Sequence, residues 1–316
     1  MMMRRWLLAA ALSVTALPAL AAFPERPIRI IVPTAPGGSS DIVTRLLTNA
    51  AREFIDQPFV IDNRPGANGN VGMDVVAKAP PDGYTLGNCA IGVCSANRAL
   101  VPMPFEQKDI EPMFWSASVM NMLALNAAVP AQSLAEFVQL ARTRELSYGS
   151  SGVGSAHHLS AALLGGVFGV KFLHVAYRGA APAIQDLLAG RVDFMVENVA
   201  TLVEHRKSGQ LRGLAVTGAA RTPIAPDLPT LRELGYPDVT LVAWFGFATR
   251  AGTSPEIVAT LNTLFNRALQ APVVQARFAE MGLIPEGGPA ARFGAHVAAE
   301  AAKWQDVVIK NNIKPE

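Results

Sequence analysis

Two short segments rich in glycine and serine contain the residues best suited to bind a small anion. Residues 36–41 read PGGSSD, and residues 149–155 read GSSGVGS. Each segment stands before apolar residues at helical spacing, so each is expected to lead into the amino end of a helix. Such an end offers unpaired backbone N–H groups and a partial positive charge, and glycine allows close backbone approach. The two segments therefore predict two anion-binding helix starts.

A purely structural role is the alternative for both segments, because many Gly/Ser loops only cap the helix that follows. Ser39, Ser40 or Asp41 is able to cap the first helix, and such a cap is compatible with ligand binding. If Asp41 provides the cap, its carboxylate turns away from a bound anion. His157 stands near the second helix start, where the dipole disfavours a protonated ring and leaves a neutral hydrogen-bonding partner. A core or surface histidine is the alternative interpretation of that residue.

The sequence matches phosphate, metal and hydrolytic sites less well than a carboxylate site. Neither segment contains G-x-x-x-x-G-K-[ST] or G-x-G-x-x-G, and neither contains lysine or arginine. A G-x-S-x-G elbow is missing, and the five histidines form no cluster with metal-ligand spacing. We therefore expect no metal, no cofactor and no enzymatic activity. A hydrolase that uses Ser151 and His157 is the catalytic alternative.

The elements that must position these segments alternate between strands and helices. A strand at residues 28–32 precedes a helix from about 41 to 54, and a strand at 146–148 precedes a helix from about 156. Such units in series predict an α/β fold with largely parallel sheets. Two similar halves are therefore expected, with the ligand in a cleft between them. The simplest ligand for two anion-binding helix starts has a carboxylate at each end. Further strands are expected at 59–61, 84–86, 174–176, 192–196 and 214–217, and further helices from 255 and over 293–308.

Charge and cysteine content narrow the partners and the compartment. The chain has 27 basic and 25 acidic residues, and two of the basic ones lie in the leader described below, so the mature net charge is formally zero. This balance argues against nucleic-acid binding and against charge-driven membrane binding. Cys89 and Cys94 are close enough in sequence for a disulfide in an oxidising compartment, and two buried free thiols are the alternative.

The amino terminus has the pattern of a cleaved secretory signal. Arg4 and Arg5 precede an apolar run over residues 6–17, and the A-L-A sequence at 19–21 matches a cleavage site. We expect a signal peptide over residues 1–21, with an uncleaved anchor or a buried first helix as the alternatives. The cleavage point has no cysteine for lipid attachment, and the rest of the chain has no apolar run of about 18 residues. The mature protein is therefore expected in the periplasm.

Short motifs follow one another along nearly the whole mature chain in an informative order. They are FPERPIR at 23–29, PGGSSD at 36–41, NRPGA at 63–67, PDGYTL at 81–86, YGSSGVGS at 148–155, HVAYRG at 174–179, GRVD at 190–193, LAVT at 214–217 and DLPT at 227–230. In this order they resemble the Bug family, the TctC-like substrate-binding proteins of tripartite tricarboxylate transporters. The resemblance implies a two-domain periplasmic binding fold of type II, the Venus-flytrap type, with the ligand cleft between the domains.

The resemblance also implies the division of the chain and the ligand contacts. Domain 1 is expected over residues 22–123 plus 244–316, domain 2 over 124–243, and hinge strands near 122–126 and 241–246. Backbone amides and hydroxyls of the two segments are expected to hold a ligand carboxylate. The implied ligand-binding residues are Gly38, Ser39, Ser40, Asp41, Ser151, Gly154, Ser155, His157 and Asp193.

One of these residues carries an open alternative, and one further segment departs from the family pattern. Asp193 follows the V-D motif and is either an acceptor that lines the cleft or a structural hydrogen-bond hub. Residues 89–94 read CAIGVC and are more apolar than is usual in the family. We hypothesise that this apolar segment makes the pocket prefer a less polar acid.

The expected function is reversible capture of a small organic carboxylate by a monomeric periplasmic receptor. The receptor would dock onto membrane transporter subunits and would have no nucleic-acid partner. A receptor for another small polar solute, such as an amide or an aromatic acid, is one alternative. A periplasmic sensor subunit is another, since it would use the same cleft.

Overall fold

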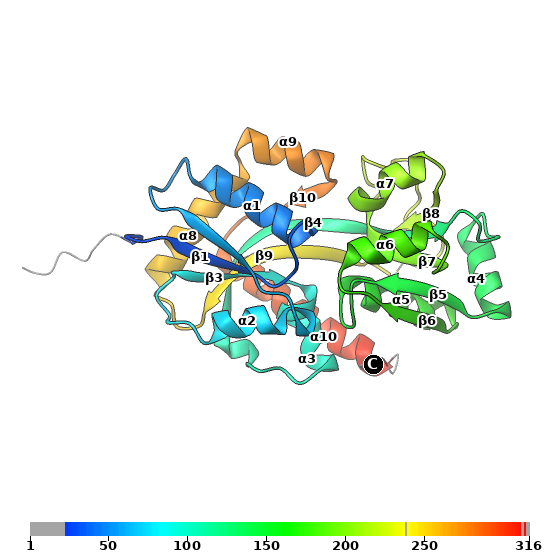
Figure 1. Cartoon of the computed structure of the whole chain (residues 1–316), viewed down its shortest axis with the longest axis horizontal. Helices are drawn as coiled ribbons and strands as arrows, with labels where there is room; N and C mark the ends of the chain where they lie inside the picture. The colour runs from blue at the N-terminus through cyan, green and yellow to red at the C-terminus, as the bar shows by residue number, and fades with distance from the viewer. Residues whose placement is uncertain (1–22, 238, 311–312, 314–316) are drawn as a thin grey trace, which may run out of the picture.

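The computed structural model describes residues 23–237, 239–310 and 313 of the chain. The expected signal peptide at residues 1–21 lies outside the described residues. Figure 1 shows two lobes joined by two long strands. The first lobe contains β1, β2, β3 and β10, and the second contains β5 to β8. None of the described helices is both long and apolar enough to cross a membrane.

A single ten-stranded sheet runs through both lobes in the order β2-β1-β3-β9-β4-β7-β5-β6, with β8 and β10 also paired to β4. Strand β1 is parallel to β2 and β3, and β5 is parallel to β6 and β7. The pairs made by β4 and β9 are antiparallel. The expected α/β fold is therefore confirmed, but the prediction of largely parallel pairing is wrong, because five of the nine strand pairs among the described residues are antiparallel and form the centre of the sheet between two parallel ends. The strands are β1 Ile28–Val32, β2 Phe59–Asn63, β3 Thr85–Ala90, β4 Ile110–Asn126, β5 Leu146–Ser150, β6 Phe172–Ala176, β7 Phe194–Asn198, β8 Leu211–Val216, β9 Val242–Arg250 and β10 Leu283–Pro285.

Strand β4 passes from one lobe into the other. Residues 110–120 pair with β9, whereas residues 121–126 pair with β7 and β8. The change of partner falls between Met120 and Asn121, close to the expected domain boundary at 123/124. Thr217, directly after β8, returns the chain to this point: its N–H donates to the carbonyl of Asn121 at 2.9 Å, and its carbonyl accepts the N–H of Leu241 at 2.9 Å. The two connections between the lobes are thus tied together by backbone bonds.

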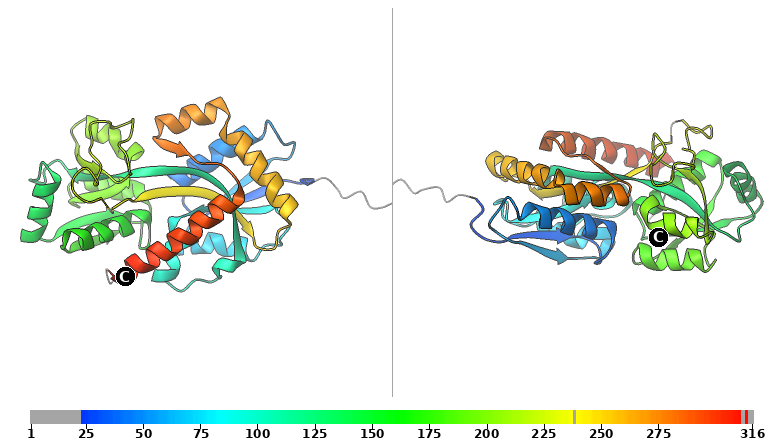
Figure 2. Two further views of the ribbon diagram at one scale, coloured as in Figure 1. Left: turned by 180° about the vertical axis from the view of Figure 1, so that it is seen from behind. Right: turned by 90° about the horizontal axis from the view of Figure 1, so that it is seen from above.

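The helices cover the sheet from both sides, as Figure 2 shows. Their formation follows local signals: Ser254 caps α8 by accepting the N–H of Ile257, Pro255 occupies the first turn, and Leu261 and Phe265 are buried. In the first lobe they are α1 Ser39–Ala51, α2 Asn70–Ala77, α3 Asn97–Leu100, α8 Pro255–Leu269, α9 Pro272–Glu280 and α10 Ala290–Lys310, with short turns η1 Ala67–Gly69, η2 Gly92–Ala96 and η3 Gln107–Asp109. In the second they are α4 Leu134–Thr143, α5 Ala156–Phe168, α6 Ala180–Leu188 and α7 Val199–Lys207.

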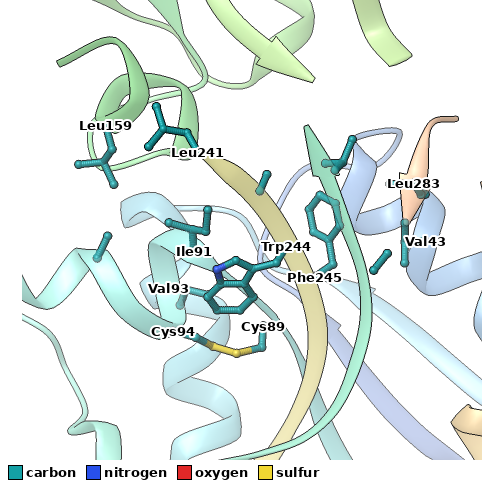
Figure 3. Packing of buried hydrophobic residues seen from close by; sticks show 14 of the residues in the cluster. Val43, Cys89, Ile91, Val93, Cys94, Leu159, Leu241, Trp244, Phe245 and Leu283 are labelled. Atoms are coloured by element: carbon teal, nitrogen blue, oxygen red, sulfur yellow. A yellow bond between two sulfur atoms is a disulfide. The ribbon is translucent and has the colours of Figure 1, made fainter. Parts of the chain in front are cut away.

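The two cysteines form a disulfide, which decides the alternative that the sequence left open. Cys89 at the end of β3 and Cys94 in η2 have Cα atoms 5.7 Å apart, and both are buried. Figure 3 shows the disulfide beside Trp244 and Val93, in the apolar cluster beneath the junction of the lobes. The bond therefore holds the turn that faces the second lobe.

Candidate functional site

The amino end of α1 presents three unpaired amides. Gly38 is the N-cap residue, and its carbonyl accepts the N–H of Ile42 at 3.0 Å. Within the described residues, the N–H groups of Ser39, Ser40 and Asp41 have no hydrogen-bond acceptor. These donors and the helix dipole give the first expected segment the character of an anion-binding helix start.

The carboxylate of Asp41 is committed to protein donors. One oxygen accepts the N–H of Gly37 at 3.0 Å and Nε of Arg45 at 2.9 Å, and the other accepts Nδ2 of Asn63 at 3.0 Å. Burial acts to raise the pKa of Asp41, but the bonds from Arg45, Gly37 and Asn63 outweigh it and hold the pKa below 3.8. Asp41 thus orders the segment before α1, but the capping alternative is wrong: the N-cap residue is Gly38, and no side chain caps this helix.

The second segment is also folded onto the start of its helix. Ser155 caps α5 by accepting the N–H of His158 at 3.3 Å, and the N–H of Gly154 donates to Nδ1 of His158 at 2.9 Å. The Gly154 amide is therefore used inside the protein. Among the described residues, the N–H groups of Ala156 and His157 have no acceptor. The free amides at the start of α5 are therefore those of the two residues that follow the N-cap Ser155.

His158 is a buried neutral base that holds the Gly154 amide of this segment. Its ring stacks on His174 with centroids 4.1 Å apart, and Tyr148 also stacks on His174 at 4.8 Å. Burial, with a smaller effect of His174, lowers the pKa of His158 to about 3. At neutral pH its Nδ1 is consequently a permanent acceptor for the Gly154 amide.

A hydrogen-bond network of side chains and the Asn198 N–H connects the two helix starts through the end of β7. Ser151 Oγ lies 2.9 Å from Nδ1 of His157, whose Nε2 lies 3.0 Å from Oε1 of Glu197. The next residue, Asn198, donates from Nδ2 to Oγ of Ser39 at 3.1 Å. With its proton on Nε2, a neutral His157 ring donates to Glu197 and accepts from Ser151. The carboxyl end of β7 therefore brings the start of α1 and the start of α5 to one place.

The lobes are in direct contact beside this hydrogen-bond network. A methyl group added to Gly154 would lie 2.7 Å from Nδ2 of Asn68 and 3.0 Å from Oδ1 of Asn97, both in the first lobe. Figure 3 shows Ile91 of the first lobe near Leu159 and Leu241, which belong to the same apolar cluster. Ile91 thus packs between the lobes, and the backbone at Gly92 lies close to Gly154 of the second Gly/Ser segment.

Asp193 lies apart from the other candidates. It stands just before β7, whereas Glu197 and Asn198 are at the opposite end of that strand. Its carboxylate accepts from the N–H and the hydroxyl of Ser147 at 2.7 and 2.9 Å, and from Arg144 at 2.8 Å. Burial acts to raise the pKa of Asp193, and the bonds from Arg144 and Ser147 lower it below 3.8. These contacts match the structural-hub alternative.

The structure brings eight of the nine predicted residues to the two helix starts and adds residues that the sequence did not single out. Glu197 and Asn198 were missed, although a polar pair directly after the apolar strand 192–196 was a usable signal. Asn68 and Asn97 were missed because nothing in their spacing connects them. One surface hollow is lined by Arg206 and Arg212, and another is lined by Phe54 and Asn266. None of the residues that line them belongs to this site. Over the described residues, no group of three His, Cys, Asp or Glu side chains is arranged to hold a metal ion.

The α/β fold of two lobes, with two helix starts that offer free amides meeting between them, is that of a solute-binding protein of the periplasmic type. Comparison with known families specifies the group. The chain belongs to the tripartite tricarboxylate transporter family receptors, whose family model matches residues 43–313. The relationship predicted from the motif order is thereby confirmed.

Individual relatives cover almost the whole chain. BugT of Bordetella pertussis is 34% identical over 297 residues, which cover 92% of this chain and 91% of the relative. The solved structure of Rhodopseudomonas palustris Rpa4515 with adipate has a TM-score of 0.87 and 36% identity, covering 93% of this chain and 100% of that one. MatC from Rhodopseudomonas palustris with bound malate has a TM-score of 0.84 and 32% identity, covering 90% and 100%.

Proposed function

We propose that this protein is a periplasmic receptor that captures a small organic carboxylate between its lobes and delivers it to membrane transporter subunits. The observation that carries the proposal is that two helix starts with free amides meet between the lobes. The hydrogen-bond network that links Ser39 to Ser151 lies between them. Such ends stabilise an anion without a lysine or an arginine. The adipate and malate bound by the two solved relatives support a carboxylate as the ligand.

The proposal assigns particular groups to the ligand. The amides of Ser39, Ser40 and Asp41 would donate to a carboxylate group of the ligand. The amides of Ala156 and His157 would face the same carboxylate from the second lobe. Among the other candidates, Gly38, Ser151, Gly154 and Ser155 would shape the two segments, and Asp193 would hold the second lobe together rather than contact the ligand.

The proposal also covers the state of the protein in the cell. Cleavage after residue 21 would release the mature chain into the periplasm as a monomer. Domain 1 would comprise residues 22–123 plus 244–316, and domain 2 would comprise residues 124–243. The change of β4 partner near residue 120 and the start of β9 at Val242 support boundaries at these places. Closure about the two connections would then bury the ligand.

A thermal-shift screen of the purified mature chain tests the proposal. The panel comprises aliphatic and aromatic mono- and dicarboxylates, amino acids and the matching amides. A ligand that binds only the folded state stabilises it by about 2.7 kcal/mol at 100 times its Kd, so a clear rise in melting temperature is expected with at least one acid. The rise should vanish when that acid is amidated. A rise with neutral solutes alone would instead support the receptor for another polar solute.

One observation favours a hydrolase as a second candidate. Ser151, His157 and Glu197 are connected in the order of a serine triad, but Nδ1 rather than Nε2 of the histidine faces the serine. Turnover of p-nitrophenyl esters that disappears in Ser151→Ala would establish the hydrolase. Under the receptor proposal, wild type and Ser151→Ala release p-nitrophenol at the same background rate.

A further inference from the structure

Two buried acceptor atoms at the site have no donor among the described residues. They are Oε2 of Glu197, whose residue is 1% exposed, and Oδ1 of Asn198, whose residue is 6% exposed. Buried acceptors are almost always hydrogen-bonded in folded proteins, because leaving one unpaired forfeits its hydration without compensation. Two such atoms on consecutive residues mark a place where a donor from outside the chain is required.

The other atoms of these side chains fix where the unpaired acceptors lie. Oε1 of Glu197 accepts from Nε2 of His157 at 3.0 Å and from the Asn198 N–H at 2.8 Å. The Asn198 amide reaches Ser39 through Nδ2, so its Oδ1, on the same carbon, lies at the start of α1. Both acceptors are therefore beside the helix starts that offer free amides.

The free amides and the two unpaired acceptors require different groups on the ligand. A carboxylate satisfies the amides of α1 and α5 but brings only acceptor atoms of its own. Placed against Glu197, a second carboxylate would add like-charge repulsion to the unpaired acceptors. An ammonium group on the ligand has three N–H donors and would supply both acceptors, whereas a hydroxyl group has one O–H donor and would supply one of them.

We propose that Glu197 and Asn198 select a carboxylic acid that carries a hydroxyl or ammonium donor on its carbon skeleton, against the unsubstituted acid of the same length. This inference rests on the proposed function and narrows the ligand class. The hydroxyl and the ammonium group have in common that each donates a hydrogen bond. A hydroxyl and an ammonium differ in charge, so matched ligands separate them.

Isothermal titration with three matched series tests the selection: succinate, malate and aspartate; glutarate, 2-hydroxyglutarate and glutamate; adipate, 2-hydroxyadipate and 2-aminoadipate. In at least one series, the donor-bearing acid should bind wild type at least tenfold more tightly than the unsubstituted acid. Preference for the hydroxy or the amino acid identifies the donor. This comparison needs no variant, so it stands even if a substitution prevents folding.

Glu197→Gln then tests the residue. Glutamine replaces one acceptor with a donor, so the donor-bearing acid should bind at least tenfold more weakly while the unsubstituted acid changes less than about threefold. Glu204→Gln is the matched control, because Glu204 lies on the adjacent α7 with 77% of its side chain exposed. It should leave every affinity unchanged.

The outcomes separate this inference from the proposed function. If the unsubstituted acid binds as tightly as its substituted partners in every series, the inference is wrong and the carboxylate receptor stands. If Glu197→Gln weakens all acids equally, Glu197 is a structural residue and the selection is again refuted. If no acid of the three series binds, the inference is wrong for these acids, and the carboxylate receptor is judged by the wider thermal-shift panel.

Discussion

At the scale of single residues, the second anion-binding segment depends on a histidine that is kept neutral. His158 accepts the Gly154 amide through Nδ1 and stacks on His174 in a buried position. Protonation of that nitrogen would replace an acceptor with a donor facing the Gly154 N–H. The low pKa of about 3 therefore preserves the shape of the segment over the ordinary pH range.

This arrangement predicts a loss of stability in mild acid. The folded-state pKa of His158 is depressed from 6.5 to about 3, so below pH 6.5 the unfolded chain binds a proton that the folded chain refuses. The free energy of unfolding should fall as the pH drops from 6.5 toward 3, by up to about 1.4 kcal/mol per pH unit from this group. Urea unfolding at a series of pH values measures the slope.

His158→Asn isolates the contribution, because the asparagine oxygen can replace Nδ1 as acceptor but does not titrate. The variant should be less stable at pH 7 and should show a shallower decline between pH 6.5 and 4. A decline as steep as that of wild type would show that other groups cause the acid sensitivity.

At the scale of elements, Thr217 joins the strands that connect the lobes. Its hydroxyl is fully buried, accepts the N–H of Asn121 at 3.0 Å and donates to the carbonyl of Leu241. Backbone bonds from the same residue reach both partners. One side chain thus satisfies polar groups on β4 and on the chain leading into β9, where the sheet passes from one lobe to the other.

Thr217→Val should lower the free energy of unfolding by about 1–3 kcal/mol, because it keeps the shape but leaves the Asn121 N–H with no hydroxyl acceptor. Thr240→Val, at an exposed position nearby in the chain, is the control and should change it by less than about 0.5 kcal/mol. Chemical denaturation measures both variants. Equal stability of Thr217→Val and wild type would show that the hydroxyl bonds contribute no net stability.

At the scale of the whole molecule, the lobes touch through Gly154. Its φ of +77° and the 2.7 Å that would separate an added Cβ from Nδ2 of Asn68 leave no room for a side chain in this arrangement. Gly169 has a similar φ of +66° at the end of α5, but an added Cβ there would meet nothing within 4 Å. The two glycines therefore share a backbone requirement and differ in the contact between lobes.

Gly154→Ala should weaken binding of the acid found in the thermal-shift screen by at least tenfold and should expand the ligand-bound protein in small-angle scattering. Gly169→Ala should lose a comparable stability, about 1 kcal/mol, with unchanged affinity and scattering. Equal affinities for the two variants would mean that this contact does not govern closure.

Local sequence was sufficient for much of the fold and for part of the site. The strands at 28–32 and 146–148, the helices after the two segments and the helix from Pro255 were predictable because periodicity and capping act within a few residues. Strand β4 was expected only near its end at 122–126, although it runs from Ile110 to Asn126. The polar and apolar residues of β4 do not alternate regularly, because the strand has different neighbours along its length.

The sequence by itself determined the α/β class, the two anion-ready helix starts and the family, because each is written in short contiguous motifs. Only the tertiary structure decided that Cys89 and Cys94 are bonded, that Asp193 lies at the far end of β7, and that Asn198 meets Ser39. That last pair is 159 residues apart in the chain. Such meetings depend on which strands pair and in which register, and those long-range choices are set by the packing of the whole sheet rather than by any local pattern.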